Sequence, residues 1–155
     1  MASKGEEADS PIETIDILLV EPNPGDTRLF TENFAEAKFT NTIYTVPDGE
    51  SALDFLHQRG EYAEKPRPDL VLLEPQLPDV SGMEILSELE NEPVLNEIPV
   101  VILTSSKTGT EIVKSHSIEA DHYLQKPIEP DEFVEFVHLI EDFWLALVQR
   151  PTSEE

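Results

Sequence analysis

Five short, almost wholly apolar segments alternate along the chain with longer segments of helical periodicity. A run of about four to eight apolar residues bounded by turn residues is typical of a strand buried on both faces. The predicted strands cover residues 15–20, 42–46, 69–73, 100–104 and 122–125. The predicted helices cover residues 26–37, 50–59, 83–91, 107–117 and 131–148.

This alternation predicts the fold class. Apolar strands separated by helices indicate a parallel sheet with helices on both faces, which is a doubly wound α/β domain. Because parallel crossovers are right-handed, the residues that follow the strands meet along one edge of the sheet. Functional residues are therefore expected at the carboxyl ends of the strands.

Length and charge set the domain organisation and exclude some partners. We expect a single domain over residues 15–149, between an acidic N-terminal tail (1–14) and a C-terminal tail (150–155). The 33 acidic and 10 basic residues give a formal net charge of -23, which argues against nucleic acid and anionic membranes as partners. The chain has no cysteine, and its first residues lack the apolar run of a signal peptide. A cytoplasmic protein is expected.

The negative charge also predicts a salt-rich habitat. Self-repulsion destabilises a compact acidic protein in dilute salt, whereas the Debye length falls to about 3 Å in molar salt. The melting temperature should therefore rise steeply as the salt concentration increases from about 0.1 M to several molar. A melting temperature that stays flat over this range, followed by circular dichroism, would contradict the prediction.

Charged and hydroxyl side chains follow the predicted strands at the shared edge. Glu21 comes after the first strand, Glu74 after the third, Thr104 at the end of the fourth and Lys126 after the fifth. Each of these residues has an ordinary explanation, as a helix cap or a solvated charge. Their occurrence together at neighbouring strand ends is much harder to explain in that way and predicts a shared site.

Four segments resemble the receiver domain of two-component response regulators. They are "ILLVEPNPGD", "DLVLLEPQLPDVSGMEIL", "PVVILTSS" and "HYLQKPIEPDEF", and the resemblance spans about residues 15–148. It implies a five-stranded parallel sheet in the order 2-1-3-4-5, the flavodoxin-like receiver fold. The loop "EPNPGDTRL" and the ending "IEDFWLALV" look most like small stand-alone receivers that partner with bacteriophytochromes and archaeal sensor kinases.

The resemblance also implies roles for individual residues. Glu74 occupies the position of the phosphoacceptor aspartate. Thr104 matches the switch hydroxyl and Tyr123 the switch aromatic, while Lys126 matches the cation that pairs with the aspartate or its phosphate. Mg²⁺ binding is expected to be weak, with Glu21 and the backbone of Gln76 as its remaining ligands.

Two departures from the family pattern predict a degenerate receiver. The second metal-binding acid is replaced by Pro22, which offers no carboxylate. Glu74 is one methylene longer than aspartate and displaces the nucleophile of an in-line phosphoryl transfer. We therefore expect a signalling module that binds a partner without ordinary phosphorylation and has no enzyme activity or cofactor of its own.

Two alternatives come from other functional classes. In the first, the chain is a functional response regulator that a sensor histidine kinase still phosphorylates at Glu74. In the second, it is a cofactor-binding enzyme of flavodoxin type. The loop after the first strand has one glycine, so it lacks the phosphate cradle of dinucleotide-binding and P-loop proteins. An absence of colour in the purified protein would argue against the second alternative.

The last predicted helix carries more apolar residues than one buried face requires. In the segment 133–148, 12 of the 16 residues are apolar, whereas about seven to nine would cover a sheet. One stripe, formed by Phe133, Val137, Ile140, Trp144 and Leu147, suits the core. The residues left over are Phe136, Leu139, Phe143 and Val148. They predict a homodimer through this helix, beside a sensor kinase or downstream signalling protein as the other partner.

Overall fold

The computed structural model describes residues 14–36, 41–80, 82–104, 122–126 and 129–149. Its strands form one parallel sheet in the order β2-β1-β3-β4-β5. The strands are β1 (Ile15–Val20), β2 (Asn41–Val46), β3 (Leu70–Leu73), β4 (Val100–Thr104) and β5 (His122–Gln125). The predicted α/β class and the order 2-1-3-4 are confirmed.

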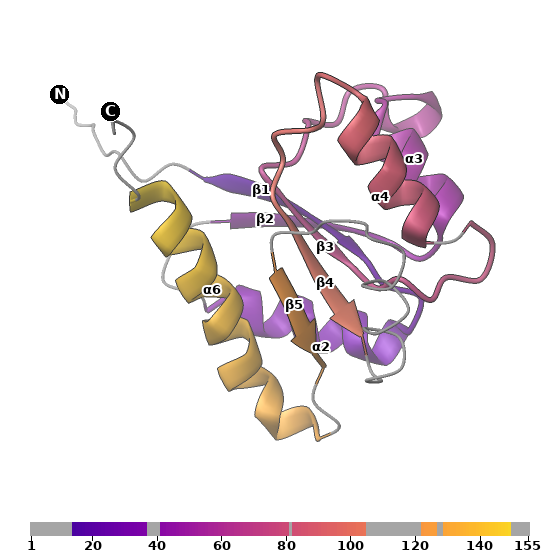
Figure 1. Cartoon of the computed structure of the whole chain (residues 1–155). Helices are drawn as coiled ribbons and strands as arrows, with labels where there is room; N and C mark the ends of the chain where they lie inside the picture. The colour runs from indigo at the N-terminus through magenta and orange to yellow at the C-terminus, as the bar shows by residue number, and fades with distance from the viewer. Residues whose placement is uncertain (1–13, 37–40, 81, 105–121, 127–128, 150–155) are drawn as a thin grey trace, which may run out of the picture.

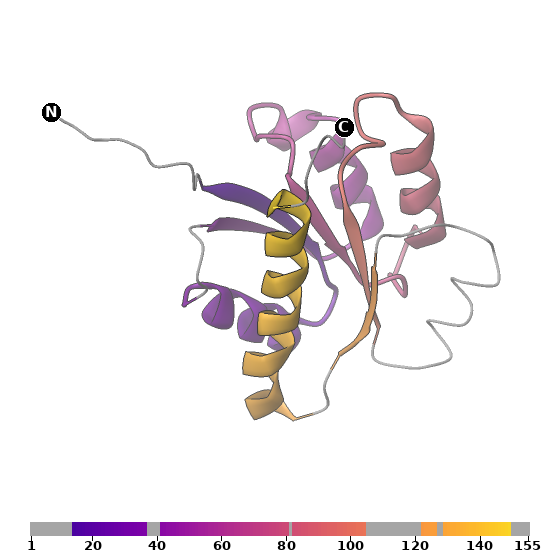
Figure 2. The ribbon, with the colours of Figure 1, turned by 60° about the vertical axis from the view of Figure 1, so that its left-hand side comes forward.

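Helices cover both faces of this sheet. They are α2 (Pro24–Phe34), α3 (Gly49–Leu56), α4 (Gly82–Asn91) and α6 (Phe133–Gln149), with short 3₁₀ turns at η1 (Gly60–Tyr62) and η2 (Pro130–Glu132). Figures 1 and 2 show α3 and α4 on one face, and α2 and α6 on the other. The predicted helix 107–117 lies outside the described residues.

Successive residues of the central strands point to opposite faces of the sheet, and each face has its own core. Leu18, Val20, Val71 and Leu73 belong to the cluster under α3 and α4. Their neighbours belong to the cluster under α2 and α6: Ile17, Leu19, Leu70 and Leu72. All eight side chains have no exposed surface, which explains why the strands read as continuous apolar runs.

Local capping sets the start of α2. Asn23 accepts hydrogen bonds from the backbone N–H groups of Gly25 and Asp26 at 2.8 and 3.2 Å, and Pro24 occupies the first helical position. The helix therefore begins two residues before the predicted start. This places Asp26 in its first turn, directly beyond the end of β1.

The position of Phe136 in α6 differs from the prediction. Phe136 was predicted to face away from the core, but it is 5% exposed and belongs to the cluster under α2 and α6. Its ring centroid lies 5.8 Å from that of Phe30 in α2. Because α6 packs against α2 as well as against the sheet, its buried arc is wider than the stripe alone. Phe143 is half-buried at the margin of this cluster, and Leu139 is 54% exposed.

None of the helices within the described ranges is long and apolar enough to span a lipid bilayer.

Candidate functional site

Two carboxylates and one ammonium are buried together where the strands end. Glu21 follows β1, Glu74 follows β3 and Lys126 follows β5. The parallel register pairs Val20 with Leu73, so the two glutamates leave neighbouring strands side by side. The residues Glu21, Glu74 and Lys126 are 3%, 3% and 5% exposed, respectively. Burial this deep is rare for charged residues unless they are paired.

The ammonium of Lys126 contacts three carboxylates. Its Nζ lies 2.6 Å from Glu21 Oε1, 3.0 Å from Asp26 Oδ2 and 3.1 Å from Glu74 Oε1. We call these four residues the lysine cluster. Asp26 was not among the residues predicted from the sequence. The signal that could have located it was the Asn23 cap, which starts α2 early enough to bring Asp26 over the strand ends.

Backbone N–H groups hold the second oxygen of each glutamate. Glu21 Oε2 accepts a hydrogen bond from the Asn23 N–H at 3.0 Å, and Glu74 Oε2 accepts one from the Gln76 N–H at 3.0 Å. Each glutamate therefore binds its own loop with one oxygen and Lys126 with the other. This arrangement fixes both side chains relative to the sheet.

Burial and charge act in opposite directions on the pKa values of the cluster. Burial is the largest influence on Glu21 and raises the pKa of its carboxyl group, although Lys126 and the Asn23 N–H oppose the rise. Burial alone would lower the pKa of Lys126, but the hydrogen bonds and charges of Glu21, Asp26 and Glu74 outweigh it. The pKa of Lys126 is therefore raised. The ammonium is the favoured form at neutral pH.

The loop after Glu74 is attached to α3. Asp79 accepts hydrogen bonds from the backbone N–H groups of Gly49 and Glu50 at 2.8 and 3.1 Å. These bonds at the helix N-terminus hold the pKa of Asp79 below its usual value. The two ends of the loop pack closely together, at Pro75 and Gly82. A Cβ on Gly82 would collide with the backbone of Pro75. Asp79 was not predicted from the sequence, since its partner lies 30 residues away.

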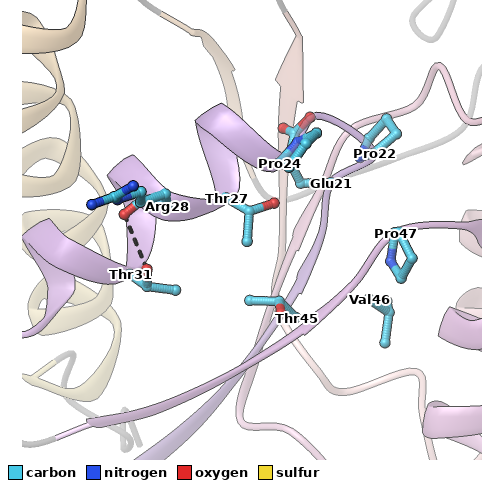
Figure 3. Close-up of a pocket in the computed structure, with 9 residues that line it drawn as sticks. All are labelled: Glu21, Pro22, Pro24, Thr27, Arg28, Thr31, Thr45, Val46 and Pro47. Carbon is cyan, nitrogen blue, oxygen red and sulfur yellow. Dashed lines mark hydrogen bonds between the residues drawn. The ribbon is translucent and has the colours of Figure 1, made fainter.

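A cavity of about 460 Å³ opens beside the lysine cluster, between α2 and the end of β2. Figure 3 shows Glu21 and Pro22 near the end of β1, and Thr27 and Thr31 on the side of α2 toward Thr45 of β2. Its lining is Glu21, Pro22, Pro24, Thr27, Arg28, Thr31, Thr45, Val46 and Pro47. Pro22, which replaces the second metal-binding acid of the family pattern, therefore contributes an apolar wall to the cavity.

The predicted switch residues lie on β4 and β5, at the edge of the sheet opposite β2. Thr104 is the last residue of β4, and the backbone of Tyr123 pairs with that of Ile102. The side chains of Thr104 and Tyr123 lie outside the described part of the structure. Their predicted switching roles stay predictions.

Comparisons with known proteins agree on one family. The family model of the response regulator receiver domain matches residues 17–138. Response regulator Rcp1 of Synechocystis sp. is 37% identical over 137 residues, covering 88% of this chain and 93% of Rcp1. The crystal structure of the phosphorylated cyanobacterial phytochrome response regulator RcpA superposes with a TM-score of 0.81 at 37% identity. It covers 90% of this chain and 100% of RcpA. The Mn²⁺-bound form of Rcp1 gives a TM-score of 0.77 at 37% identity and covers 84% and 94% of the two chains.

Proposed function

The chain belongs to the response regulator receiver family, and we propose that it is a receiver-like module of a two-component phosphorelay that signals without ordinary aspartyl phosphorylation. Receiver domains are generally signalling modules without enzyme activity. The observation that carries the proposal is the lysine cluster, in which Glu74 already faces Lys126 at 3.1 Å. Partner binding then replaces phosphoryl transfer as the working step.

The chemistry of phosphoryl transfer supports this proposal. The reaction requires a metal ion that bridges phosphate oxygens and a nucleophile placed in line with the leaving group. Pro22 supplies no carboxylate to a metal, and Glu74 carries its carboxylate one methylene further out than aspartate does. A misplacement of about 1 Å can lower a rate about a hundredfold. Both departures act against ordinary phosphorylation.

Glu74 also supports a constant signalling state. Its carboxylate places a negative charge 3.1 Å from Lys126, the residue that pairs with the phosphate according to the family resemblance. We infer that Glu74 acts as a built-in substitute for the phosphorylated residue and holds an active-like state without a kinase. The competing interpretation is an inert remnant in a protein that no longer switches. Binding of the partner by the wild type but not by Glu74→Gln would favour the substitute.

The test of the proposed function uses a small phosphodonor. Wild-type protein incubated with acetyl phosphate and Mg²⁺ should show no phosphoryl adduct in intact-mass spectrometry. A receiver with an intact aspartate serves as the positive control. Stable phosphorylation at Glu74 would overturn the proposal and establish the second candidate, a response regulator that a sensor histidine kinase phosphorylates. The likeness to the phosphorylated RcpA favours that candidate.

Receiver-only regulators interact with histidine kinases or with downstream proteins. We propose one of these as the partner of this chain, in the cytoplasm. The formal net charge of -23 favours a partner with a basic surface and disfavours nucleic acid.

The homodimer through α6 stays a prediction. Because Phe136 is buried, the exposed apolar surface of α6 is smaller than the sequence suggested. Leu139 and Val134 are 54% and 48% exposed, and the acidic residues Glu135 and Asp142 lie on the same outward face. Leu139→Glu should therefore reduce the mass found by sedimentation in molar salt from about twice 17.4 kDa to that of a monomer. Val94→Glu, which adds the same charge at a 60% exposed apolar residue in the turn after α4, away from α6, is the control. A monomeric wild type would eliminate the dimer.

A further inference from the structure

Receivers of this family are expected to hold a divalent cation beside the phosphoacceptor, and the site residues of this chain do not fit one. Mg²⁺ requires near-octahedral oxygen ligands at about 2.0 to 2.1 Å. Among the residues that the structure describes, no group of three or more acidic, histidine or cysteine side chains is arranged to hold a metal ion. Position 22 contributes a proline ring, and one oxygen of Glu74 already accepts a hydrogen bond from the Gln76 N–H.

A different cation already occupies the centre of the carboxylates. The Lys126 ammonium lies between 2.6 and 3.1 Å from oxygens of Glu21, Asp26 and Glu74. An ammonium has three N–H donors, so three carboxylate oxygens satisfy it completely. Its side chain is 4% exposed, and those of Glu21 and Glu74 are 1% and 5% exposed. Water therefore contributes little to neutralising these charges.

We propose that Lys126 is the resident cation of this site in place of a divalent metal, and that Asp26 supplies the third carboxylate in place of the acid missing at position 22. The inference deepens the proposed function, since it makes the state of the site independent of Mg²⁺. The three carboxylates come from the end of β1, the first turn of α2 and the end of β3. Lys126 joins these elements to β5.

Competition for the same oxygens explains why the lysine excludes a metal. The remaining oxygens of Glu21 and Glu74 are held by the backbone N–H groups of Asn23 and Gln76. A divalent ion would have to displace the ammonium from all three of its partners. The ammonium would then stay buried beside an ion that carries two positive charges. Removing the ammonium should instead free the three carboxylates to move together around a divalent ion, since carboxylate is a ligand type that suits Mg²⁺ and Mn²⁺.

Mn²⁺ binding tests the proposal. Calorimetric titrations of Mn²⁺ are made in molar KCl, which screens diffuse binding to the acidic surface. The wild type should show no one-to-one site, and Lys126→Met should acquire one. Adding Asp26→Asn to Lys126→Met should weaken that site at least tenfold, whereas adding Asp142→Asn, at an exposed position of α6, should not. A wild type with a one-to-one site would overturn the proposal, as would a folded Lys126→Met without a site.

A second variant keeps the test independent of the folding of Lys126→Met. Asp26→Asn retains the ammonium and its two glutamate partners. Its denaturation midpoint should fall below that of the wild type and of Asp54→Asn, which loses an exposed ion pair with Arg59, equally with and without Mn²⁺. An unchanged midpoint would show that Asp26 does not serve as the third carboxylate, and a midpoint that Mn²⁺ restores would show that the lysine does not exclude metal.

Failure of this inference is distinguishable from failure of the proposed function. A wild type that binds Mn²⁺ one-to-one but takes no phosphoryl group overturns the inference alone. A wild type that acetyl phosphate labels while it shows no Mn²⁺ site overturns the proposed function alone.

Discussion

The double variant Pro22→Asp, Glu74→Asp should accept a phosphoryl group from acetyl phosphate in the presence of Mg²⁺, at a rate at least about a hundredfold above that of the wild type. Pro22→Asp restores the second acid next to Glu21, so that a metal ion gains an anionic ligand. Glu74→Asp withdraws the carboxylate by one methylene, to the reach that in-line attack requires. It also weakens the 3.1 Å contact with Lys126 and frees the ammonium for the incoming phosphate. Intact-mass spectrometry over time measures the rate.

Matched variants separate the two contributions. Pro22→Asn with Glu74→Asp has nearly the same shape but lacks the restored charge, and it should remain close to the wild type. Glu74→Asp alone should do so as well, because the metal ligand is still missing. Rapid labelling of either control would show that the acid at position 22 is not required. A folded double variant that stays unlabelled would mean that Lys126 or Asp26 still blocks the metal.

Lys126→Met should lower the free energy of unfolding at neutral pH by about 3 to 5 kcal/mol, the cost expected when one member of a buried ion group is removed. The reason is that Glu21 and Glu74 stay buried without a counter-ion, and Asp26 loses its partner. Methionine is close to lysine in length and apolar volume, so cavity formation adds little. Denaturant titration followed by the fluorescence of Trp144, the single tryptophan, gives the difference from the wild type.

The loss should depend on pH in a defined direction. The pKa of Lys126 is raised from its ordinary value of 10.5, so its stabilisation is complete below that pH and disappears only as the pH rises through the raised value. The pKa of Glu21 is raised from 4.5, so its ionisation costs stability at neutral pH, and this cost disappears as the pH falls through the raised value. Lys126 opposes the rise in the Glu21 pKa, so the rise should be larger in Lys126→Met. Acidification should therefore reduce the difference between Lys126→Met and the wild type.

Lys65→Met is the control for loss of a lysine. Lys65 is exposed, and its Nζ lies 5.7 Å from the centre of the Tyr44 ring. An exposed cation–π contact contributes about 0.5 to 1 kcal/mol, so this variant should lose no more than that amount. A loss in Lys126→Met as small as the loss in Lys65→Met would show that the three carboxylates do not depend on the ammonium.

The residues that sequence reasoning located correctly share a local signal. The apolar runs of β1, β3 and β4 are buried on both faces, and such strands need no long-range information to be recognised. The strand order came from the family resemblance rather than from the runs themselves. Glu21, Glu74 and Lys126 were placed together because parallel strands bring their carboxyl ends to one edge.

The residues that were missed or misplaced depend on contacts between elements. Asp26 reaches Lys126 across 100 residues, and only the capped start of α2 sets its height above the sheet. Phe136 was assigned to the wrong face because helical periodicity describes a single buried stripe, whereas α6 packs against Phe30 of α2 in addition to the sheet. A second packing surface widens the buried arc without changing the sequence pattern.

The long sequence span of the lysine cluster has a consequence for synthesis on the ribosome. The hydrogen bonds from Lys126 to Glu21 and Asp26 join residues 105 and 100 positions apart. The three carboxylates are therefore translated well before Lys126, the cation that they share, and domains begin to fold from the N-terminus during synthesis. A nascent chain that ends before β5 would have to bring Glu21, Asp26 and Glu74 together against their mutual repulsion. Emergence of Lys126 from the exit tunnel is thus expected to be the event that allows this edge of the sheet to close.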